Sequence, residues 1–437
     1  MLQLFGSGLI SLLFDMAGVH AKPLDALDLL ALQSSPGLVI ARDPNPAAAI
    51  TVQQYLKELE ALKLVGADQG VWIQSGPVLL ANHQGEVPLP AASLTKIATS
   101  LAALKTWGPD HQFETLISAT GPVRDGVLQG DLVITGSGDP FFIWEEAIAL
   151  GNSLNQLGIN RVTGNLVISG NFAMNYKFNP ALSGELLKQG LDAKLWPSVA
   201  DAIFLKNFPQ GTPRPQVVIS GSVQVAPFPV PKQILLMRHR SLPLAQILKE
   251  MNIYSNNEMA EILAQSLGGA QVVQQLAATL ARVPQSSIHL VNGSGLGVEN
   301  RISPRAVCAM FGAIQRQLLP YQLSVADLFA VAGRDRRGTL APRHVPPATV
   351  VKTGTLRDVS ALAGVMPTRD RGLVWFAIIN RGTDVERFRA GQDQLLQRLL
   401  QQWRVAPLLP AALTPHVRGS TPTQLGAASR NEILYKG

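Results

Sequence analysis

The sequence contains a single cysteine, Cys308, so intrachain disulfides and a cysteine-based zinc site are both excluded. The seven histidines are widely spaced and form no paired zinc-ligand motif, and no Gly-x-Ser-x-Gly elbow of a Ser-His-Asp hydrolase is present. No stretch reaches about 18 uncharged apolar residues, which argues against several membrane spans. Basic runs of five or more residues are also absent, so the net charge of +7 does not indicate a nucleic-acid partner.

The composition is that of a folded protein with few charges. Hydrophobic residues make up 46% of the 437 residues and charged residues only 15%, which excludes global disorder. The length allows roughly two to three domains with substantial cores.

The N-terminal segment is open to two interpretations. Met1 to Ala21 is mostly apolar and ends at a small residue before Lys22, as a secretory signal peptide does. However, no basic residue precedes Lys22, and Asp15 interrupts the apolar stretch. Residues 1–50 are therefore expected to be either a signal segment or an apolar helix that is retained.

Periodicity and glycine spacing divide the rest of the chain. Apolar spacing predicts helices over about 52–64, from about Ala92, and over 385–403, a hairpin of 71–73 with 78–80, and strands at 349–352, 359–366 and 373–380. Between them, residues 107–225 change to short glycine-bounded strands around one helix at about 144–157, and a Pro-rich stretch follows. We expect a catalytic unit split into 51–106 and 226–405, an inserted β-rich domain at 107–225, and a disordered tail at 406–437.

Three short motifs follow one another along the chain. They are Ser93-Leu94-Thr95-Lys96, Ser255-Asn256-Asn257 and Lys352-Thr353-Gly354. Ser93 falls at an expected helix start, and Lys96 lies three residues later on the same face. A serine becomes a nucleophile only when a base takes its proton, and a neutral lysine can do so if its pKa falls from ~10.4 to about 7–8. This pair therefore indicates a nucleophile and its base.

The other two motifs supply groups that would complete such a site. An ammonium on Lys352 would lower the pKa of Lys96 and attract a substrate carboxylate, with Thr353 beside it. Gly354 leaves room for an extended peptide along the strand edge, and the N–H groups of Ser93 and Thr355 could form an oxyanion hole. Ser255 could relay a proton between Lys96 and the leaving amine, and Asn257 could hold a substrate amide, although Ser255 could instead be the N-cap of a helix over 258–267.

The three motifs in this order resemble the signature of penicillin-binding proteins and related β-lactamases. Between Lys96 and Ser255 lie 158 residues, residues 97–254, where a long β-rich insertion fits one group of these enzymes. The sequence thus resembles the D-alanyl-D-alanine carboxypeptidase/endopeptidase family, the class C low-molecular-mass penicillin-binding proteins, over about residues 50–405. Further stretches that share the resemblance are 88–93, 130–132, 136–140, 164–167, 292–296, 300–304 and 338–340.

The resemblance implies an α/β fold, an α+β sandwich in which helices flank an antiparallel sheet. It implies a serine-type D-Ala-D-Ala carboxypeptidase that acts on peptidoglycan stem peptides through an acyl-enzyme, is acylated by β-lactams, and could also cut cross-links as an endopeptidase. It implies no metal or cofactor and a periplasmic or cell-envelope location. The alternatives are a catalytically weak wall-binding scaffold of the same fold and a β-lactamase-like hydrolase.

The sequence also departs from this family. Asn292 stands where the family usually has Asp, and Arg334 to Arg337 lengthen the loop before Gly338. Residues 171–176 do not follow the family pattern. The Glu-x-x-Leu-Asn deacylation motif of class A β-lactamases is absent from the sequence, which counts against efficient β-lactam hydrolysis.

Overall fold

The computed structural model describes residue 39, residues 41–63, 65–227 and 229–408, residue 410, and residues 413–415 and 424–435. The expected signal segment or apolar helix over Met1 to Ala21 lies outside the described residues. In the described part of the chain, none of the helices combines the length and the apolar character needed to cross a membrane.

One sheet of seven strands organises the larger unit. Its order is β1-β3-β2-β19-β18-β17-β16, and every neighbouring pair is antiparallel except β1 with β3. The expected hairpin and the three expected C-terminal strands all belong to this sheet. The strand bounds are β1 Ala41–Arg42, β2 Val65–Ser75, β3 Val78–His83, β16 Ala330–Val331, β17 Val350–Leu356, β18 Val359–Thr368 and β19 Gly372–Gly382.

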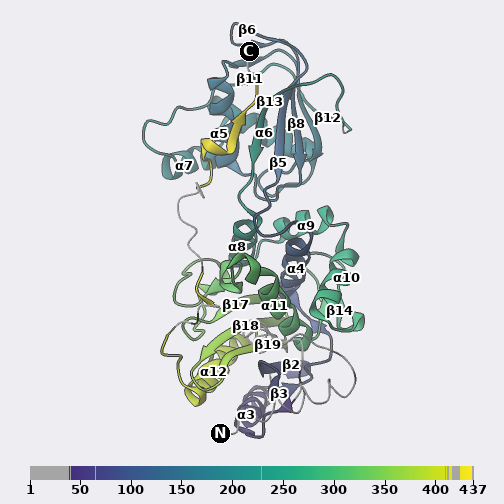
Figure 1. The fold of residues 1–437 in the computed structure, drawn as a ribbon, viewed down its shortest axis with the longest axis vertical. Helices are drawn as coiled ribbons and strands as arrows, with labels where there is room; N and C mark the ends of the chain where they lie inside the picture. Colours follow the sequence, from purple (N-terminus) through teal and green to yellow (C-terminus); the bar gives the residue numbers. More distant parts are fainter. Residues whose placement is uncertain are drawn as a thin grey trace, which may run out of the picture.

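The central strands of this sheet carry apolar residues on both faces, and helices cover each face. In β18, Leu362 and Met366 pack with Phe388 in one apolar core, whereas Ala361 and Val365 contribute to the other. α3 and α12 lie over the first face, and α4 with α8 to α11 lie over the second (Figure 1). The predicted antiparallel sheet flanked by helices is thus confirmed. The helix bounds are α3 Ala47–Ala61, α4 Thr95–Trp107, α8 Leu244–Tyr254, α9 Asn257–Ser266, α10 Ala270–Ala281, α11 Pro304–Leu318 and α12 Val385–Trp403.

A three-stranded sheet joins two segments that are far apart in sequence. Its order is β14-β15-β4, with β4 (Leu89–Pro90) paired to β15 (Arg301–Ile302) and β15 paired to β14 (Ile288–His289). The segment before Ser93 is therefore fixed beside the segment that follows residues 292–297.

The residues between α4 and α8 build a second unit around two further sheets, with the orders β12-β10-β8-β5-β13-β20 and β11-β9-β7-β6. Its three α-helices, one of which connects the parallel strands β8 and β10, make it a mixed unit rather than a purely β-rich one. The element bounds are β5 Glu114–Ala119, β6 Val123–Arg124, β7 Val127–Leu128, β8 Leu132–Ser137, α5 Trp144–Gln156, β9 Arg161–Val162, β10 Leu166–Asn171, α6 Pro180–Leu191, α7 Ser198–Asn207, β11 Val218–Ile219, β12 Val223–Val225, β13 Ile234–Arg240 and β20 Asn431–Ile433.

The observed pairing moves two expected domain boundaries. β13 pairs with β5 across the second unit, so we propose that the insertion ends after Arg240 rather than at residue 225. The Pro-rich stretch is thus a connection inside the unit and not its exit. At the other end, β1 and α3 place residues 41–50 within the larger unit, and not in a separate N-terminal segment.

The C-terminal segment is also placed differently from the expected disordered tail. β20 pairs antiparallel with β13, and residues 431–433 therefore lie in the second unit, far from the N-terminal part of the described chain (Figure 1). Arg430 forms an ion pair with the buried Glu146, and the Asn431 side chain contacts His239 Nδ1 at 2.7 Å. These partners lie about 190–280 residues earlier in the chain, where local composition gives no signal of them.

We predict that Arg430→Ala destabilises the protein strongly. The substitution leaves the carboxylate of Glu146, whose side chain is 1% exposed, without its cation, and breaking such a buried pair costs roughly 3–5 kcal/mol. The measurement is the midpoint of urea unfolding followed by circular dichroism. Arg387→Ala is the control, because it removes an exposed pair with Asp384 worth less than about 1 kcal/mol. Equal midpoints for the two variants would contradict the prediction.

Candidate active site

Ser93 lies in a tight turn between a strand and a helix. β4 leads into the 3₁₀ turn η1 (Ala92–Leu94), and α4 begins at Thr95. Ala92 has a φ of 47°, in the left-handed region that a non-glycine residue adopts only when its surroundings hold it there. The turn leaves Ser93 half-buried while its neighbours Ala92 and Leu94 are buried.

Lys96 is the centre of the arrangement. Its side chain is fully buried, and its Nζ donates three hydrogen bonds, to Ser93 Oγ at 3.1 Å, to Asn257 Oδ1 at 2.7 Å and to the Ser294 carbonyl oxygen at 2.8 Å. Three chain segments therefore meet at one amine.

Burial changes the protonation of this amine. Loss of solvation lowers the pKa of Lys96 to about 7, against the opposing effect of the carboxylates of Glu261 and Glu258. A substantial fraction of Lys96 is thus neutral near neutral pH, which is what a proton acceptor for Ser93 requires.

The segment 255–257 touches both lysines of the site. Ser255 ends α8 in the left-handed conformation, with a φ of 54°, and α9 begins at Asn257. The Ser255 Oγ accepts a hydrogen bond from Lys352 Nζ at 2.9 Å, whereas Asn257 Oδ1 accepts from Lys96. The alternative role of Ser255 as a helix N-cap is wrong, because the side chain of Asn256 caps α9 by accepting from the Met259 N–H at 2.9 Å.

The third motif lies on β17, on an edge without a strand partner. β16 pairs with β17 only at Val350 and Val351, so among the described strands none covers the outer edge of β17 from Lys352 onward. Lys352 Nζ also donates to the Thr353 carbonyl oxygen at 2.8 Å, and burial together with the charge of Lys96 lowers its pKa. An extended ligand could therefore add to this edge, beside a buried amine.

Gly354 also allows a close approach between two chain segments. A Cβ built on it would lie 3.1 Å from the Ala91 carbonyl oxygen and 3.2 Å from Ala92 Cβ. The missing side chain thus lets η1 pack against β17, which brings Ser93 to the sheet edge. Thr353 contacts Thr339 through their hydroxyls at 2.6 Å, and Thr355 at the rim accepts from Arg389 at 2.8 Å.

The loop 292–297 is a part of the site to which the sequence motifs assign no role. Its Ser294 carbonyl oxygen binds Lys96, and its Gly295, with a φ of +85°, lies against the Ser93 turn. A backbone carbonyl has no side-chain signature, so the resemblance over 292–296 marks this loop without indicating a role for Ser294. Glu261, Thr339 and Arg389 are likewise absent from the three motifs.

The structure therefore brings together Ser93, Lys96, Ser255, Asn257 and Lys352, with Thr353, Gly354 and Thr355 continuing the edge strand. α4, α8 and α9 meet in the part of the larger unit that lies nearest the second unit (Figure 1). Within the described ranges, no group of three or more His, Cys, Asp or Glu side chains is arranged to hold a metal ion.

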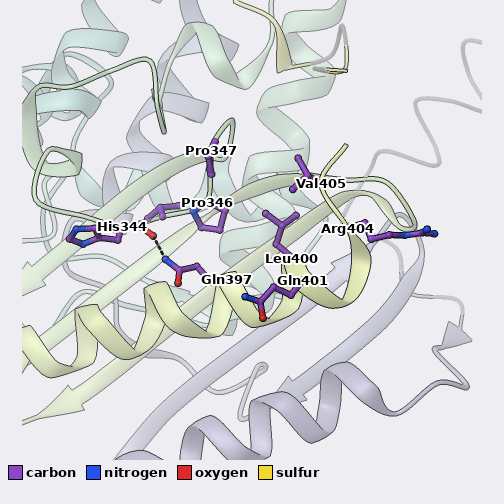
Figure 2. A pocket seen from close by; sticks show the side chains of 9 residues that line it. His344, Pro346, Pro347, Gln397, Leu400, Gln401, Arg404 and Val405 are labelled. Carbon is purple, nitrogen blue, oxygen red and sulfur yellow. Dashed lines mark hydrogen bonds between the residues drawn. The ribbon is translucent and has the colours of Figure 1, made fainter. Parts of the chain in front are cut away.

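A cavity of about 640 Å³ lies elsewhere, at the C-terminal end of α12 (Figure 2). Gln397 closes one side of it by donating to the His344 carbonyl oxygen at 2.8 Å. None of the eight residues singled out by the motifs lines it, so it is separate from the Ser93 site. Its lining residues are His344, Val345, Pro346, Pro347, Gln397, Leu400, Gln401, Arg404 and Val405.

Comparisons with known proteins show what this chain is similar to. The model of the D-Ala-D-Ala carboxypeptidase 3 (S13) family matches residues 49–180 and 177–402. The D-alanyl-D-alanine carboxypeptidase of Actinomadura sp. (strain R39) is 25% identical over 485 residues, covering 86% of this chain and 88% of that protein. The D-alanyl-D-alanine carboxypeptidase DacB of Haemophilus influenzae is 22% identical over 389 residues, covering 67% of this chain and 80% of the relative.

Solved structures show the same fold. The penicillin G-acylated predatory endopeptidase of Bdellovibrio bacteriovorus superposes with a TM-score of 0.67 at 21% identity, covering 84% of this chain and 99% of the other. Penicillin binding protein 4 of Haemophilus influenzae superposes with a TM-score of 0.60 at 20% identity, covering 80% and 99% respectively.

We predict that Gly295→Ala is more damaging than Gly297→Ala. Both glycines have positive φ, so both substitutions introduce backbone strain of roughly 1–3 kcal/mol. At Gly295 the added Cβ would also lie 1.9 Å from the Ala92 carbonyl oxygen, whereas at Gly297 it would meet only the end of the Glu299 side chain. The readout is the thermal unfolding midpoint. A midpoint for Gly295→Ala equal to or above that of Gly297→Ala would contradict the close approach of loop and turn.

Proposed function

The chain belongs to the D-Ala-D-Ala carboxypeptidase 3 (S13) family and is thus a serine-type carboxypeptidase, and we propose that Ser93 is its nucleophile. The observation that carries this assignment is the hydrogen bond between Ser93 Oγ and a buried Lys96 amine whose pKa lies near 7. The proposed substrate is a peptidoglycan stem peptide that ends in two D-alanines, and the proposed place of action is the periplasm or cell envelope, where this polymer lies.

The first half of the reaction forms an acyl-enzyme. Neutral Lys96 accepts the hydroxyl proton of Ser93 as its Oγ attacks the carbonyl carbon between the two D-alanines. The bond between that carbon and the nitrogen of the terminal D-alanine then breaks, and the proton that Lys96 took from Ser93 passes to the departing amine, which leaves Lys96 neutral again. In the second half, Lys96 takes a proton from the water that attacks the ester, the bond to Ser93 Oγ breaks, and Ser93 takes up that proton as the shortened peptide leaves.

The remaining motif residues position the substrate. Lys352 forms no ion pair with any residue that the structure describes, so its Nζ is available to the terminal carboxylate of the substrate, with Thr353 beside it. Binding of that carboxylate would favour the charged form of Lys352 against the burial that lowers its pKa. We propose that Ser255, whose Oγ accepts a hydrogen bond from Lys352 Nζ, relays the proton from Lys96 to the leaving amine. Asn257, while bound to Lys96, holds a substrate amide, and the N–H groups of Ser93 and Thr355 stabilise the oxyanion.

Two finer properties belong to the same proposal. β-Lactams would acylate Ser93, because they present a strained amide carbonyl to Ser93 and a carboxylate to Lys352 and Thr353. Cleavage of peptide cross-links is the second activity proposed. The uncovered edge of β17 can bind an extended peptide, and in a cross-link the amine that leaves belongs to a second stem peptide.

We predict that penicillin adds its mass to the peptide that contains Ser93. Incubation of the native protein followed by peptide mass spectrometry should locate the adduct, and Ser93→Ala should abolish it. Release of free D-alanine from a stem peptide, measured in parallel, tests the carboxypeptidase assignment. An unlabelled native protein would favour a wall-binding scaffold, and rapid loss of the label with turnover of penicillin would favour a β-lactamase-like hydrolase.

We predict that acylation depends on a group with a pKa near 7. Lys96 must be neutral to accept the Ser93 proton, so the rate should rise as the pH increases through about 7 and then level off. Lys96→Arg should reduce acylation by about 10²–10⁴-fold at every pH, because a guanidinium cannot be deprotonated under these conditions. Stopped-flow measurement with a fluorescent penicillin gives both profiles. Rapid acylation by the arginine variant would exclude Lys96 as the proton acceptor.

A further inference from the structure

Glu261 contacts the active site without belonging to any of the three motifs. It lies on α9, four residues after Asn257, so the two side chains share a face of the helix. Its two carboxylate oxygens each accept one backbone N–H: Oε1 accepts from Ser294 at 2.9 Å and Oε2 from Gly293 at 3.1 Å. A charged acceptor that engages two successive N–H groups fixes the orientation of the peptide between them.

The carbonyl groups of the same two residues point to α4. Ser294 O accepts from Lys96 Nζ at 2.8 Å, and Gly293 O accepts from Thr99 Oγ1 at 2.7 Å. Residues 293–294 thus connect Glu261 on one helix to Lys96 on another. Ser294 is only 1% exposed, so water cannot readily replace these bonds if the loop rotates.

The rest of the loop is held at its ends. Asn300 Oδ1 accepts from the N–H groups of Val291 and Asn292 at 3.0 and 3.3 Å, and Asn292 Oδ1 accepts from the Gly295 N–H at 2.8 Å. The Gly295 N–H belongs to the same peptide group as the Ser294 carbonyl, so Asn292 holds the peptide that faces Lys96 directly. Glu261 holds the two preceding peptide groups and so fixes the backbone that leads into it.

We propose that Glu261 is a positioning residue of the reaction: by binding the Gly293 and Ser294 N–H groups, it fixes the backbone that places the Ser294 carbonyl beside Lys96, and through that carbonyl it holds the amine beside Ser93. This inference rests on the proposed function of Ser93 and Lys96.

Glu261 has a second, separable effect through its charge. The charged groups facing Lys96 are Glu258 and Glu261 from α9 and Lys352 from β17. Both carboxylates favour protonated Lys96, so loss of either charge lowers its pKa and keeps the amine neutral to a lower pH. Glu258 is exposed and has no hydrogen bond to the loop, which makes it a matched control for charge alone.

The test measures the rate of acylation by fluorescent penicillin from pH 5 to 9.5 in the native protein and in Glu261→Gln, Glu258→Gln and Glu261→Asp. Both glutamine variants should move the rising limb to lower pH. Only Glu261→Gln should lower the maximal rate, by about 10²-fold, because a misplaced catalytic group costs about that factor. Glu258→Gln should keep the maximum within about threefold of native. Glu261→Asp keeps the charge but shortens the side chain, so its limb should stay in place while its maximum falls at least about tenfold.

The outcomes separate the two levels of the proposal. If the native protein labels on Ser93 and Glu261→Gln behaves like Glu258→Gln, the positioning role is wrong while the proposed function stands. If the native protein does not label at all, the proposed function fails and this inference fails with it. If Glu261→Gln does not fold, judged by its thermal midpoint, Glu261→Asp decides: a native maximal rate would overturn the positioning role, and a reduced rate at an unchanged limb would support it.

Discussion

The site depends on one buried amine. Moving the pKa of Lys96 from 10.5 to about 7 corresponds to roughly 5 kcal/mol of preference for its neutral form. A buried amine also leaves three bonding directions to satisfy, and the structure satisfies them with Ser93, Asn257 and Ser294, each from a different segment. Burial and hydrogen bonding of the Lys96 amine therefore require residues more than 150 positions apart in the sequence to come together, and the proposed activation of Ser93 depends on this.

Close backbone contacts make that convergence possible. The Ser93 turn lies between Gly295 on one side and Gly354 on the other, and a Cβ on either glycine would meet the carbonyl oxygen of Ala92 or Ala91. Gly338 has a similar position, because a Cβ there would lie 2.2 Å from the Ile253 carbonyl oxygen, two residues before Ser255. At these positions the absence of a side chain thus allows one backbone segment to pack closely against another.

The parts of the structure that the sequence predicts are those with a local cause. α12 spans Val385–Trp403, as its apolar periodicity predicts, and the strands of the central sheet follow their runs of β-branched and aromatic residues. Ser93, Lys96 and Lys352 are recognisable because their side chains carry the proposed chemistry. The Ser294 carbonyl and the docking of Arg430 on Glu146 are not, since both depend on pairings between distant segments that leave no periodic or compositional trace. For the same reason the Pro-rich stretch after residue 225 suggests a domain boundary, although β13 beyond it completes the sheet of the second unit.

The second unit contacts the larger unit close to α9, the helix that carries Asn257. The chain crosses between the units at 108–113 and at 241–243, and the crossings bind each other through the Ser241 N–H to the Phe113 carbonyl and the Phe113 N–H to Ser241 Oγ, both at 2.9 Å. Beyond these crossings, Phe141 of the second unit packs in the core of the larger one, and a Cβ on Gly138 would lie 2.8 Å from Ser266 Oγ at the end of α9. α9 also carries Asn257, which accepts a hydrogen bond from Lys96, and Glu261, which binds the loop 292–297. The second unit therefore packs against a helix that contacts both Lys96 and this loop. This contact between the units does not depend on any substrate, because it is made between described residues of both.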